Sequence, residues 1–267
     1  MSGLFIVETN YLLVLVGVIF VAFGGYQIKS LTISGAIATI FVGFGVAFGF
    51  GYEGLVLLGI FFATSSFWSK FKSERKVELE SKLQKGEQRD AIQVLANGGV
   101  PAFASVLYGY YPHELWLYIF VGAICTANAD TWASELGTLS KRRPILITKL
   151  KSVDKGTSGA ISLLGTIAAI LGTILISFVA LLFFETISIS TALGLALIGF
   201  IGNFIDTLLG ATVQVSYRCQ ICGIDTEKDV HCGRKTTYYK GVTFLNNDVI
   251  NALSIFLASV IGGYILL

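Results

Sequence analysis

Four carboxylate residues lie within or at the ends of long apolar segments, and the sequence places no lysine or arginine beside them. They are Asp130, Glu135, Asp206 and Asp248. An ionisable group at membrane depth costs about 2.5–3.5 kcal/mol on insertion scales, and such groups usually face a cavity and take part in function. Because no fixed cation accompanies these acids, we expect their partner to come from outside the chain, as a divalent metal, a bound substrate or a transported cation.

The densest polar motif is NADTWASELG, residues 128–137, at the end of one apolar segment. It holds two acids, an amide and two hydroxyls, which is more than helix packing requires. On an ideal helix Asp130 and Glu135 would project about 140° apart. They can therefore bind the same ion only if the helix unwinds or a second helix closes the site.

Two later segments supply further polar groups at helical spacing. Within residues 202–212, Asn203 and Asp206 fall on one helix face, and Asp206 is the deepest of the four acids in its apolar run. Asn247 and Asp248 belong to an Asn-Asn-Asp run that opens the last apolar segment. One residue of that run is expected to cap the helix, and the others exceed what a cap needs.

Another polar segment opens the apolar run that begins near residue 91. Asp90, Gln93 and Asn97 are three and four residues apart and share one helix face. This face either lines a polar cavity or forms hydrogen bonds with a neighbouring helix. Arg89 at its start suits phosphate binding, because the planar guanidinium matches phosphate geometry.

The segment KGTSG, residues 155–159, precedes a further long apolar run. Backbone N–H groups and hydroxyls at a helix N-terminus form an anion site, and Lys155 would add a positive charge. The alternative is an ordinary helix N-cap at Thr157 or Ser158. The chain contains no Walker A sequence.

Three cysteines and a histidine follow the spacing Cys219-x2-Cys222-x8-His231-Cys232 in a basic loop. A reducing compartment disfavours disulfides, and four such side chains can form a closed tetrahedral zinc site. Adjacent ligands are less usual, so the sequence leaves open whether zinc binds. Any zinc here would be structural, because no coordination position stays open. Cys125, inside an apolar segment, is expected to be a small packing residue.

The composition is that of a membrane protein. The 267 residues are 54% hydrophobic and only 13% charged, and the mean hydropathy is +0.74, which excludes a soluble globular domain and a disordered protein. At about 20 apolar residues per span, we expect an all-α polytopic membrane protein with about eight transmembrane helices. The predicted spans are Tyr11–Gly25, Leu31–Phe50, Gly54–Phe67, Ala91–Tyr110, Leu115–Leu136, Gly159–Phe184, Ala192–Val215 and Val249–Leu267.

The basic residues are grouped in four places, at Lys29 and within residues 70–89, 141–155 and 218–240. With eight spans these four places lie on one side, and the opposite side carries only acids. The positive-inside rule then makes the basic loops cytoplasmic and both termini extracytoplasmic. We therefore expect a multi-pass protein of the cell membrane whose active-site face is cytoplasmic.

The chain divides into two parts by the distribution of its polar motifs. Residues 1–69 are expected to form N-terminal transmembrane helices with little chemistry. Residues 70–267 are expected to form a membrane catalytic domain that includes a cytoplasmic loop at 216–243. The charged segment Ser69–Glu87 is predicted to be a solvated cytoplasmic helix.

Several motifs occur in a fixed order along the second part. They are QRD at 88–90, LANGG at 95–99, ADTWASELG at 129–137, GTSG at 156–159, DTLLGAT at 206–212 and NND at 246–248. As a set they resemble an integral-membrane family that includes plant phytyl-phosphate kinase and animal transmembrane protein 19. More distantly, their order is similar to that of CTP-dependent polyprenol kinases and phosphatidate cytidylyltransferases.

The resemblance implies phosphorylation of a membrane-held prenyl monophosphate to the diphosphate by a nucleoside triphosphate such as CTP. On this hypothesis Asp130, Asp206 and Glu135 are catalytic, and together with Asp248 they hold one or two Mg²⁺ ions, which prefer carboxylate and phosphate oxygens. The expected substrate- and nucleotide-binding residues are Arg89, Asp90, Asn97, Lys155, Gly156, Thr157, Ser158, Asn203 and Asn247.

Two other functions stay open from the sequence. A cation- or proton-coupled transporter would also carry membrane carboxylates, but the polar motifs cluster toward one face, whereas transport needs access from both. A cytidylyltransferase that joins CMP to a lipid phosphate differs only in which phosphorus is attacked. The expected partners are the bilayer, a prenyl-phosphate lipid and a nucleoside triphosphate, and no nucleic acid.

Overall fold

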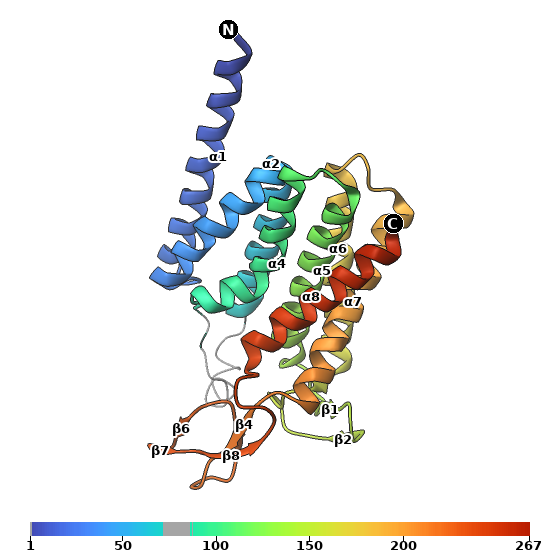
Figure 1. Cartoon of the computed structure of the whole chain (residues 1–267). Helices are drawn as coiled ribbons and strands as arrows, with labels where there is room; N and C mark the ends of the chain where they lie inside the picture. Colours follow the sequence, from blue (N-terminus) through green and yellow to red (C-terminus); the bar gives the residue numbers. More distant parts are fainter. Residues whose placement is uncertain (1, 72–85, 87) are drawn as a thin grey trace.

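The computed structural model describes residues 2–71, 86 and 88–267. Within them the chain is mostly helical and forms an elongated bundle (Figure 1). The helices are α1 (Ser2–Gln27), α2 (Ile33–Lys70), α4 (Ala91–Tyr110), α5 (Glu114–Gly137), α6 (Leu163–Phe183), α7 (Ile189–Thr212) and α8 (Asn247–Leu266). The predicted cytoplasmic helix at Ser69–Glu87 falls almost wholly outside the described residues.

Five of the described helices, α2, α4, α6, α7 and α8, are long and apolar enough to cross a membrane. Their surfaces carry large exposed apolar side chains such as Phe103, Leu182 and Leu193, which suits contact with lipid. The described helices therefore agree with a helical membrane protein, and the count of eight spans stays a prediction.

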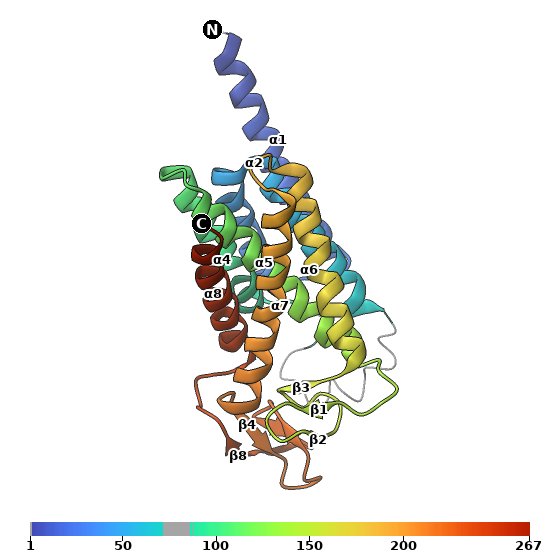
Figure 2. The same ribbon diagram turned by 90° about the vertical axis from the view of Figure 1, so that its right-hand side faces the viewer.

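Helix α5 lies inside the bundle, with α4, α6, α7 and α8 packed around it (Figures 1 and 2). Its residues are buried almost without interruption from Leu115 to Ala129. A helix that is apolar on every side belongs in a protein core or in a membrane, and here the neighbouring helices cover it. The polar motif at residues 128–137 continues directly from this buried stretch, so its side chains emerge at one end of the bundle.

Helix α2 contains a sharp kink at Gly51, whose φ and ψ are 55° and −143°. Such a backbone conformation is essentially restricted to glycine. Beyond the kink the chain turns back, and Lys70 Nζ donates a hydrogen bond to the carbonyl oxygen of Ile28, just before α2 begins. The predicted spans Leu31–Phe50 and Gly54–Phe67 thus correspond to two arms of one kinked element.

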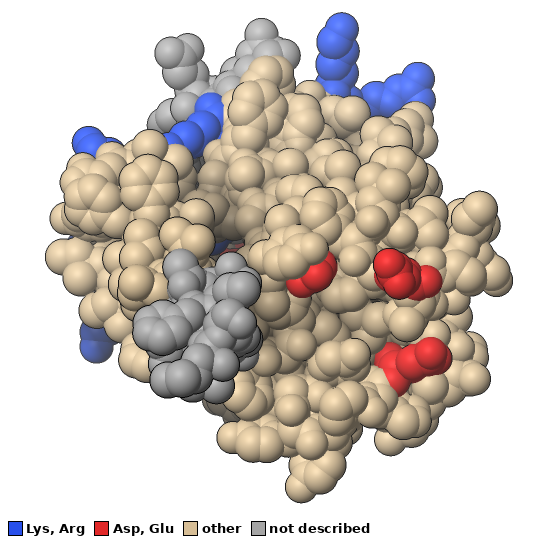
Figure 3. Space-filling view, turned by 90° about the horizontal axis from the view of Figure 1, so that it is seen from above, with Lys and Arg blue, Asp and Glu red and all other residues tan. Residues whose placement is uncertain are grey.

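The two ends of the bundle differ in charge. The chain termini lie toward one end and the β strands lie at the other (Figure 1). Glu53 follows the kink of α2, Glu114 begins α5 and Glu185 lies between α6 and α7, and these parts of the chain lie toward the end that holds the termini. When the molecule is viewed from that end, acidic side chains lie on the visible face, while Lys and Arg side chains lie mainly at its rim (Figure 3). This arrangement matches the predicted grouping of the basic loops, and which end is cytoplasmic stays a prediction.

The basic loops around residues 141–155 and 218–240 contain short antiparallel strands, which the sequence analysis does not predict. One three-stranded sheet has the order β2-β1-β3, another has the order β5-β4-β8, and β6 pairs with β7. Strands this short give no periodic sequence signal, so the all-α prediction holds for the bundle and is wrong for these loops. The strands are β1 (Ile145–Leu146), β2 (Lys151–Ser152), β3 (Ala160–Ile161), β4 (Ser216–Arg218), β5 (Asp225–Thr226), β6 (Val230–His231), β7 (Arg234–Lys235) and β8 (Thr237–Lys240).

Candidate active site

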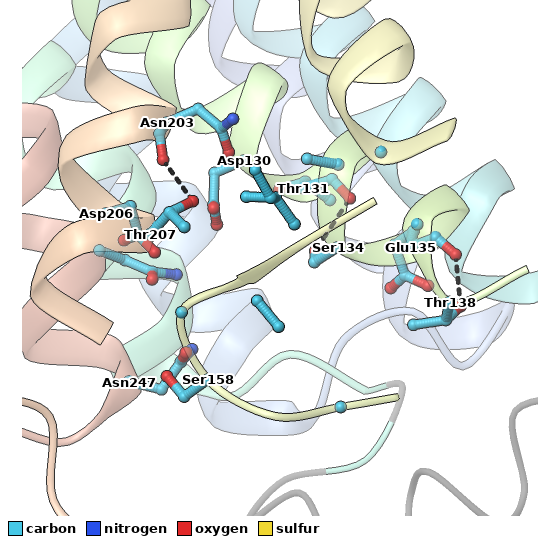
Figure 4. Close-up of a pocket in the computed structure, with 18 of the residues that line it drawn as sticks. Asp130, Thr131, Ser134, Glu135, Thr138, Ser158, Asn203, Asp206, Thr207 and Asn247 are labelled. Atoms are coloured by element: carbon cyan, nitrogen blue, oxygen red, sulfur yellow. Dashed lines mark hydrogen bonds between the residues drawn. The ribbon is translucent and has the colours of Figure 1, made fainter. Parts of the chain in front are cut away.

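A polar cavity of about 370 Å³ lies at the strand-bearing end of the bundle. Helices α4, α5, α6, α7 and α8 and the end of α2 line it together with both strand-containing loops (Figure 4). Segments that are far apart in the sequence therefore meet in one place. The predicted site residues that line this cavity are Arg89, Asn97, Asp130, Glu135, Lys155, Gly156, Thr157, Ser158, Asn203, Asp206, Asn247 and Asp248.

Asp130 of α5 and Asp206 of α7 face one another in the cavity (Figure 4), close enough for their charges to interact. Ser254 of α8 donates a hydrogen bond to Asp206 Oδ2 over 3.1 Å. The helices approach closely because α7 carries Gly202, where a Cβ atom would lie 2.4 Å from the Thr126 Cγ2 atom. Two carboxylates in this arrangement repel one another unless a proton or a cation neutralises them.

The first turn of α8 forms another wall of the cavity. Asn246 caps this helix by accepting a hydrogen bond from the backbone N–H of Val249, as predicted for one residue of the Asn-Asn-Asp run. Asp248 lines the cavity and is only 7% exposed. With its amide oriented to donate, Asn251 forms a hydrogen bond of 3.1 Å to Asp206 Oδ2.

Glu135 lies on the other side of the cavity from Asp130 and Asp206 (Figure 4). Its Oε1 atom accepts a hydrogen bond of 2.6 Å from Ser69, and the charge of Arg89 acts on it. The expectation that all four acids lack a fixed cation is therefore wrong for Glu135. The sequence hides this pairing because Arg89 comes from a different segment, at the start of α4.

Arg89 is held by two serines at the end of α2. Its Nη1 atom donates to Ser66 Oγ over 3.2 Å and its Nη2 atom donates to Ser69 Oγ over 3.3 Å. Burial lowers the pKa of the Arg89 guanidinium from its ordinary value, while the Glu135 carboxylate acts in the opposite direction. Since arginine stays protonated in proteins, Arg89 supplies a fixed positive charge to this side of the cavity.

The turn at residues 154–159 brings a second cation to the same side. Lys155 Nζ donates a hydrogen bond of 3.0 Å to the carbonyl oxygen of Thr138, at the end of α5. Gly156 and Gly159 have positive φ values of 78° and 80°, and a Cβ atom on Gly159 would lie 2.3 Å from that of Ala211. Glycine is therefore required where this turn packs against α7.

The predicted helix N-terminus at this turn is not found. Helix α6 begins at Leu163, and its N-cap is Ser162, so neither Thr157 nor Ser158 caps the helix. The strand β3 separates the turn from α6, and Ser158 instead donates a hydrogen bond of 2.6 Å to Gln214 Oε1. The turn lines the cavity without the helix dipole that the sequence analysis expected behind it.

Asp90 is the one predicted binding residue that does not line the cavity. It is the N-cap of α4, where its Oδ1 atom accepts a hydrogen bond of 2.9 Å from the backbone N–H of Gln93, and the Gln93 side chain completes a capping box. The spacing of Asp90 and Asn97 predicts one shared helix face, but an N-cap precedes the helix and its side chain folds back on the first turn.

The predicted asparagines line the cavity from three different helices. Asn97 comes from α4, Asn203 from α7 and Asn247 from α8. The amide of Asn97 donates to the carbonyl oxygen of Gln93 within its own helix. This observation favours the cavity-lining interpretation of that helix face over hydrogen bonding between helices.

Glu227 is a cavity residue that the sequence analysis missed. It lies in the loop after α7, accepts a hydrogen bond of 2.8 Å from Gln214 Nε2, and its charge acts on Asp206. Because it follows a two-residue strand, no helical spacing links it to the other acids. Ser69 and Ser254 were missed for a similar reason, since a single serine in an apolar helix gives no distinctive signal.

The four metal-ligand candidates of the same loop lie together. One ligand atom from each of Cys219, Cys222, His231 and Cys232 falls within 4.8 Å of the others. A hydrogen bond from the backbone at Cys222 is the main cause that lowers the pKa of the Cys219 thiol, to about 6. Cys125 is fully buried in α5, as expected for a packing residue.

The bundle and its cavity define a helical membrane protein with a carboxylate-lined polar site at one end. The chain belongs to the family described as integral membrane protein DUF92, whose profile matches residues 16–259, and this confirms the predicted integral-membrane family.

Three relatives span most of the chain. Protein PGR of Arabidopsis thaliana is 33% identical over 263 residues, covering 90% of this chain and 90% of the relative. An uncharacterized membrane protein of Methanocaldococcus jannaschii is 35% identical over 192 residues, covering 70% of this chain and 76% of the relative. Protein VTE6, chloroplastic, of Arabidopsis thaliana is 28% identical over 249 residues, covering 91% and 68%. No solved structure matches this chain.

Proposed function

We propose that the protein is a membrane phosphotransferase that converts a phytyl-like prenyl monophosphate into the diphosphate, with CTP as the phosphoryl donor. The observation that carries this proposal is that Asp130 and Asp206 face one another in a cavity that also holds Arg89 and Lys155. Facing acids on one side of a cavity and fixed cations on the other suit a metal-bound polyphosphate. The motifs support the choice of substrate, because they resemble a family that includes plant phytyl-phosphate kinase.

The residues around the facing aspartates fit Mg²⁺. Asp130, Asp206 and Asp248 offer carboxylate oxygens, and Asn203 and Asn247 offer amide oxygens, which are hard ligands of the kind that Mg²⁺ prefers. We assign the ion to the facing pair Asp130 and Asp206, and to Asp248 through water, since Mg²⁺ usually keeps several waters. A bound Mg²⁺ would neutralise charge on the phosphoryl group during transfer.

We propose a different role for Glu135 from the metal-binding role that the sequence suggests. Ser69 and Arg89 already engage this carboxylate, and it lies apart from Asp130 and Asp206 (Figure 4). We propose that Glu135 orients Arg89, which binds the nucleotide phosphates together with Lys155. The backbone N–H groups of the turn at 156–159 would add neutral donors to the same phosphates.

The reaction requires little covalent help from the protein, because phosphoryl transfer depends mainly on positioning and charge neutralisation. A phosphate oxygen of the prenyl monophosphate attacks the γ-phosphorus of CTP. The bond between the γ-phosphorus and the bridging oxygen then breaks, and CDP leaves with the electron pair. Arg89 and Lys155 hold the CTP phosphates in place, so that the attacking and leaving oxygens can lie in line.

We also propose how the chain sits in the membrane. Counting the two arms of α2 separately, together with α1, α4, α5, α6, α7 and α8, gives the eight predicted spans. The strand-bearing end and its cavity are assigned to the cytoplasm by the positive-inside rule. The prenyl chain would lie among the spans, with its phosphate in the cavity.

The test is a product assay on the purified full chain in detergent. It is incubated with Mg²⁺, each of CTP, ATP, GTP and UTP, and phytyl or geranylgeranyl monophosphate, and the products are identified by mass spectrometry. We expect prenyl diphosphate and CDP in equal amounts. Failure to form diphosphate with any of these pairs would refute the proposal, and release of pyrophosphate with a CDP-linked lipid would replace the kinase by a cytidylyltransferase.

A further inference from the structure

The loop between α7 and α8 folds without an apolar core of its own. From Ser216 to Lys240 its buried residues are Cys219 and Thr226, and most of the other side chains are exposed. Short strands of this kind are marginal in water unless something else fixes them. The loop therefore needs another source of stability, and the cysteine and histidine side chains gather at its centre.

Three distances within this cluster are close to those of a tetrahedral metal site. Cys222 Sγ lies 3.8 Å from Cys232 Sγ, and His231 Nδ1 lies 3.5 Å from Cys222 Sγ and 3.2 Å from Cys232 Sγ. Zinc bonds of about 2.3 Å to sulfur and about 2.0 Å to nitrogen place neighbouring tetrahedral ligands about 3.5–3.8 Å apart. A disulfide would need about 2.05 Å between sulfurs, and all three cysteines are free.

The backbone around the ligands is also shaped for an ion. Gly223 and Gly233 directly follow Cys222 and Cys232 and have φ values of 73° and 72°, so that each ligand is followed by a tight turn. Cys232 itself has a φ of 51°, an uncommon conformation for a residue other than glycine. The backbone N–H of Ile221 donates a hydrogen bond to the sulfur of Cys219 over 3.4 Å, a contact that stabilises a thiolate.

We infer that Cys219, Cys222, His231 and Cys232 bind one structural zinc ion, which folds this loop and thereby holds Glu227 at the cavity. Three sulfurs and one nitrogen complete the tetrahedron, so no position is open for catalysis. Glu227 lies between the two ligand pairs, directly after β5 and shortly before β6. Because metal binding to such a site supplies folding free energy, loss of zinc would release the carboxylate from its contact with Gln214.

Zinc content of the purified full chain tests the inference without reference to its activity. Metal analysis by mass spectrometry should give about one zinc per chain in protein purified without chelator. The double variant Cys222→Ser and Cys232→Ser should lose it, while Cys125→Ala, which removes the remaining cysteine inside α5, should keep it. Wild-type protein that carries no zinc, and takes up none when it is added, would overturn the inference.

Thiol alkylation gives a second readout that does not depend on a variant that folds. In the native wild-type chain the three loop cysteines should resist N-ethylmaleimide until a chelator removes the metal, and then all three should react. Peptide mass spectrometry identifies the modified residues. Equal reactivity of Cys219, Cys222 and Cys232 before and after chelation would contradict the zinc site.

Discussion

At the residue scale, the four predicted acids do not share the same surroundings. Asp130 and Asp206 face one another with neutral hydrogen-bond donors around Asp206, whereas Glu135 lies beside a serine and a partly buried arginine. Repulsion within the aspartate pair favours binding of a dication. The difference in surroundings separates a proposed metal side of the cavity from a proposed phosphate side.

Replacing either facing aspartate tests the metal side. We expect Asp130→Asn and Asp206→Asn each to lower kcat by about 100-fold or more, the usual size for loss of a group that stabilises transition-state charge. The variants should elute as folded protein, and the rise in Tm that Mg²⁺ gives the wild type should disappear. Asp229→Asn, an exposed acid of the same loop as Glu227, is the control. Full activity in either variant removes the metal role from that residue.

Arg89 tests the phosphate side. Arg89→Lys keeps the charge but loses the planar fork, so the KM for CTP should rise about 10-fold, equivalent to about 1.4 kcal/mol, with a smaller change in kcat. Arg218→Lys is a matched control, because Arg218 is exposed and pairs with Asp225 outside the cavity. An unchanged KM in Arg89→Lys would show that the guanidinium does not bind the nucleotide.

At the scale of elements, two irregular segments shape the site. The kink of α2 at Gly51 turns the second arm back, and this arm presents Ser66 and Ser69 to Arg89. The loop after α7 presents Glu227 to the same cavity. The helices supply the four predicted acids, the second arm of α2 supplies the serines that hold Arg89, and the loop adds the carboxylate of Glu227.

The kink can be tested by substituting glycines of the same helix. Gly51→Ala should cost about 1–3 kcal/mol of stability, because its backbone conformation is strained for any residue with a Cβ atom. Gly59→Ala should leave stability equal or raise it by about 0.5–1 kcal/mol, since no atom lies within 4 Å of the added methyl. Thermal unfolding in detergent compares the two. Equal Tm values would contradict a glycine-dependent kink.

The roles of the zinc ion and of the Glu227 carboxylate in this loop can be tested separately. We expect Glu227→Gln to retain zinc and to lower phosphoryl transfer several-fold, because the charge next to Asp206 is lost while the loop stays folded. The double cysteine variant should lose both zinc and transfer. Zinc analysis and the product assay are run on the same preparations. Transfer at the wild-type rate in Glu227→Gln would mean that this carboxylate only packs against Gln214.

At the scale of the whole molecule, the bundle is asymmetric. The acidic turns lie at the end that holds the termini, and the cavity and basic loops lie at the other (Figures 1 and 3). A transport site needs access from both ends, while a phosphotransferase needs access from the side that holds nucleotide. The asymmetry therefore favours the proposed enzyme.

The proposed orientation can be tested with reporter fusions in a bacterial host. The C-terminus is expected outside the cytoplasm. Alkaline phosphatase fused after Leu267 should therefore be active, and green fluorescent protein fused at the same position should not fluoresce. A fusion inserted at the exposed residue Leu150 should give the opposite pair of results. Fluorescence from the C-terminal fusion would reverse the orientation and move the cavity to the outer face.

The sequence by itself determined the helical segments, and all but one of the site residues that it predicted for the cavity do line it. Long apolar runs report membrane helices because each span must be apolar along its length, and acids inside such runs stand out. It could not determine the Arg89–Glu135 pairing, the capping role of Asp90 or the presence of Glu227. Those depend on contacts between segments that are distant in the chain, on the backbone at Gly51 and on loop strands too short to have a period, so only the tertiary structure decided them.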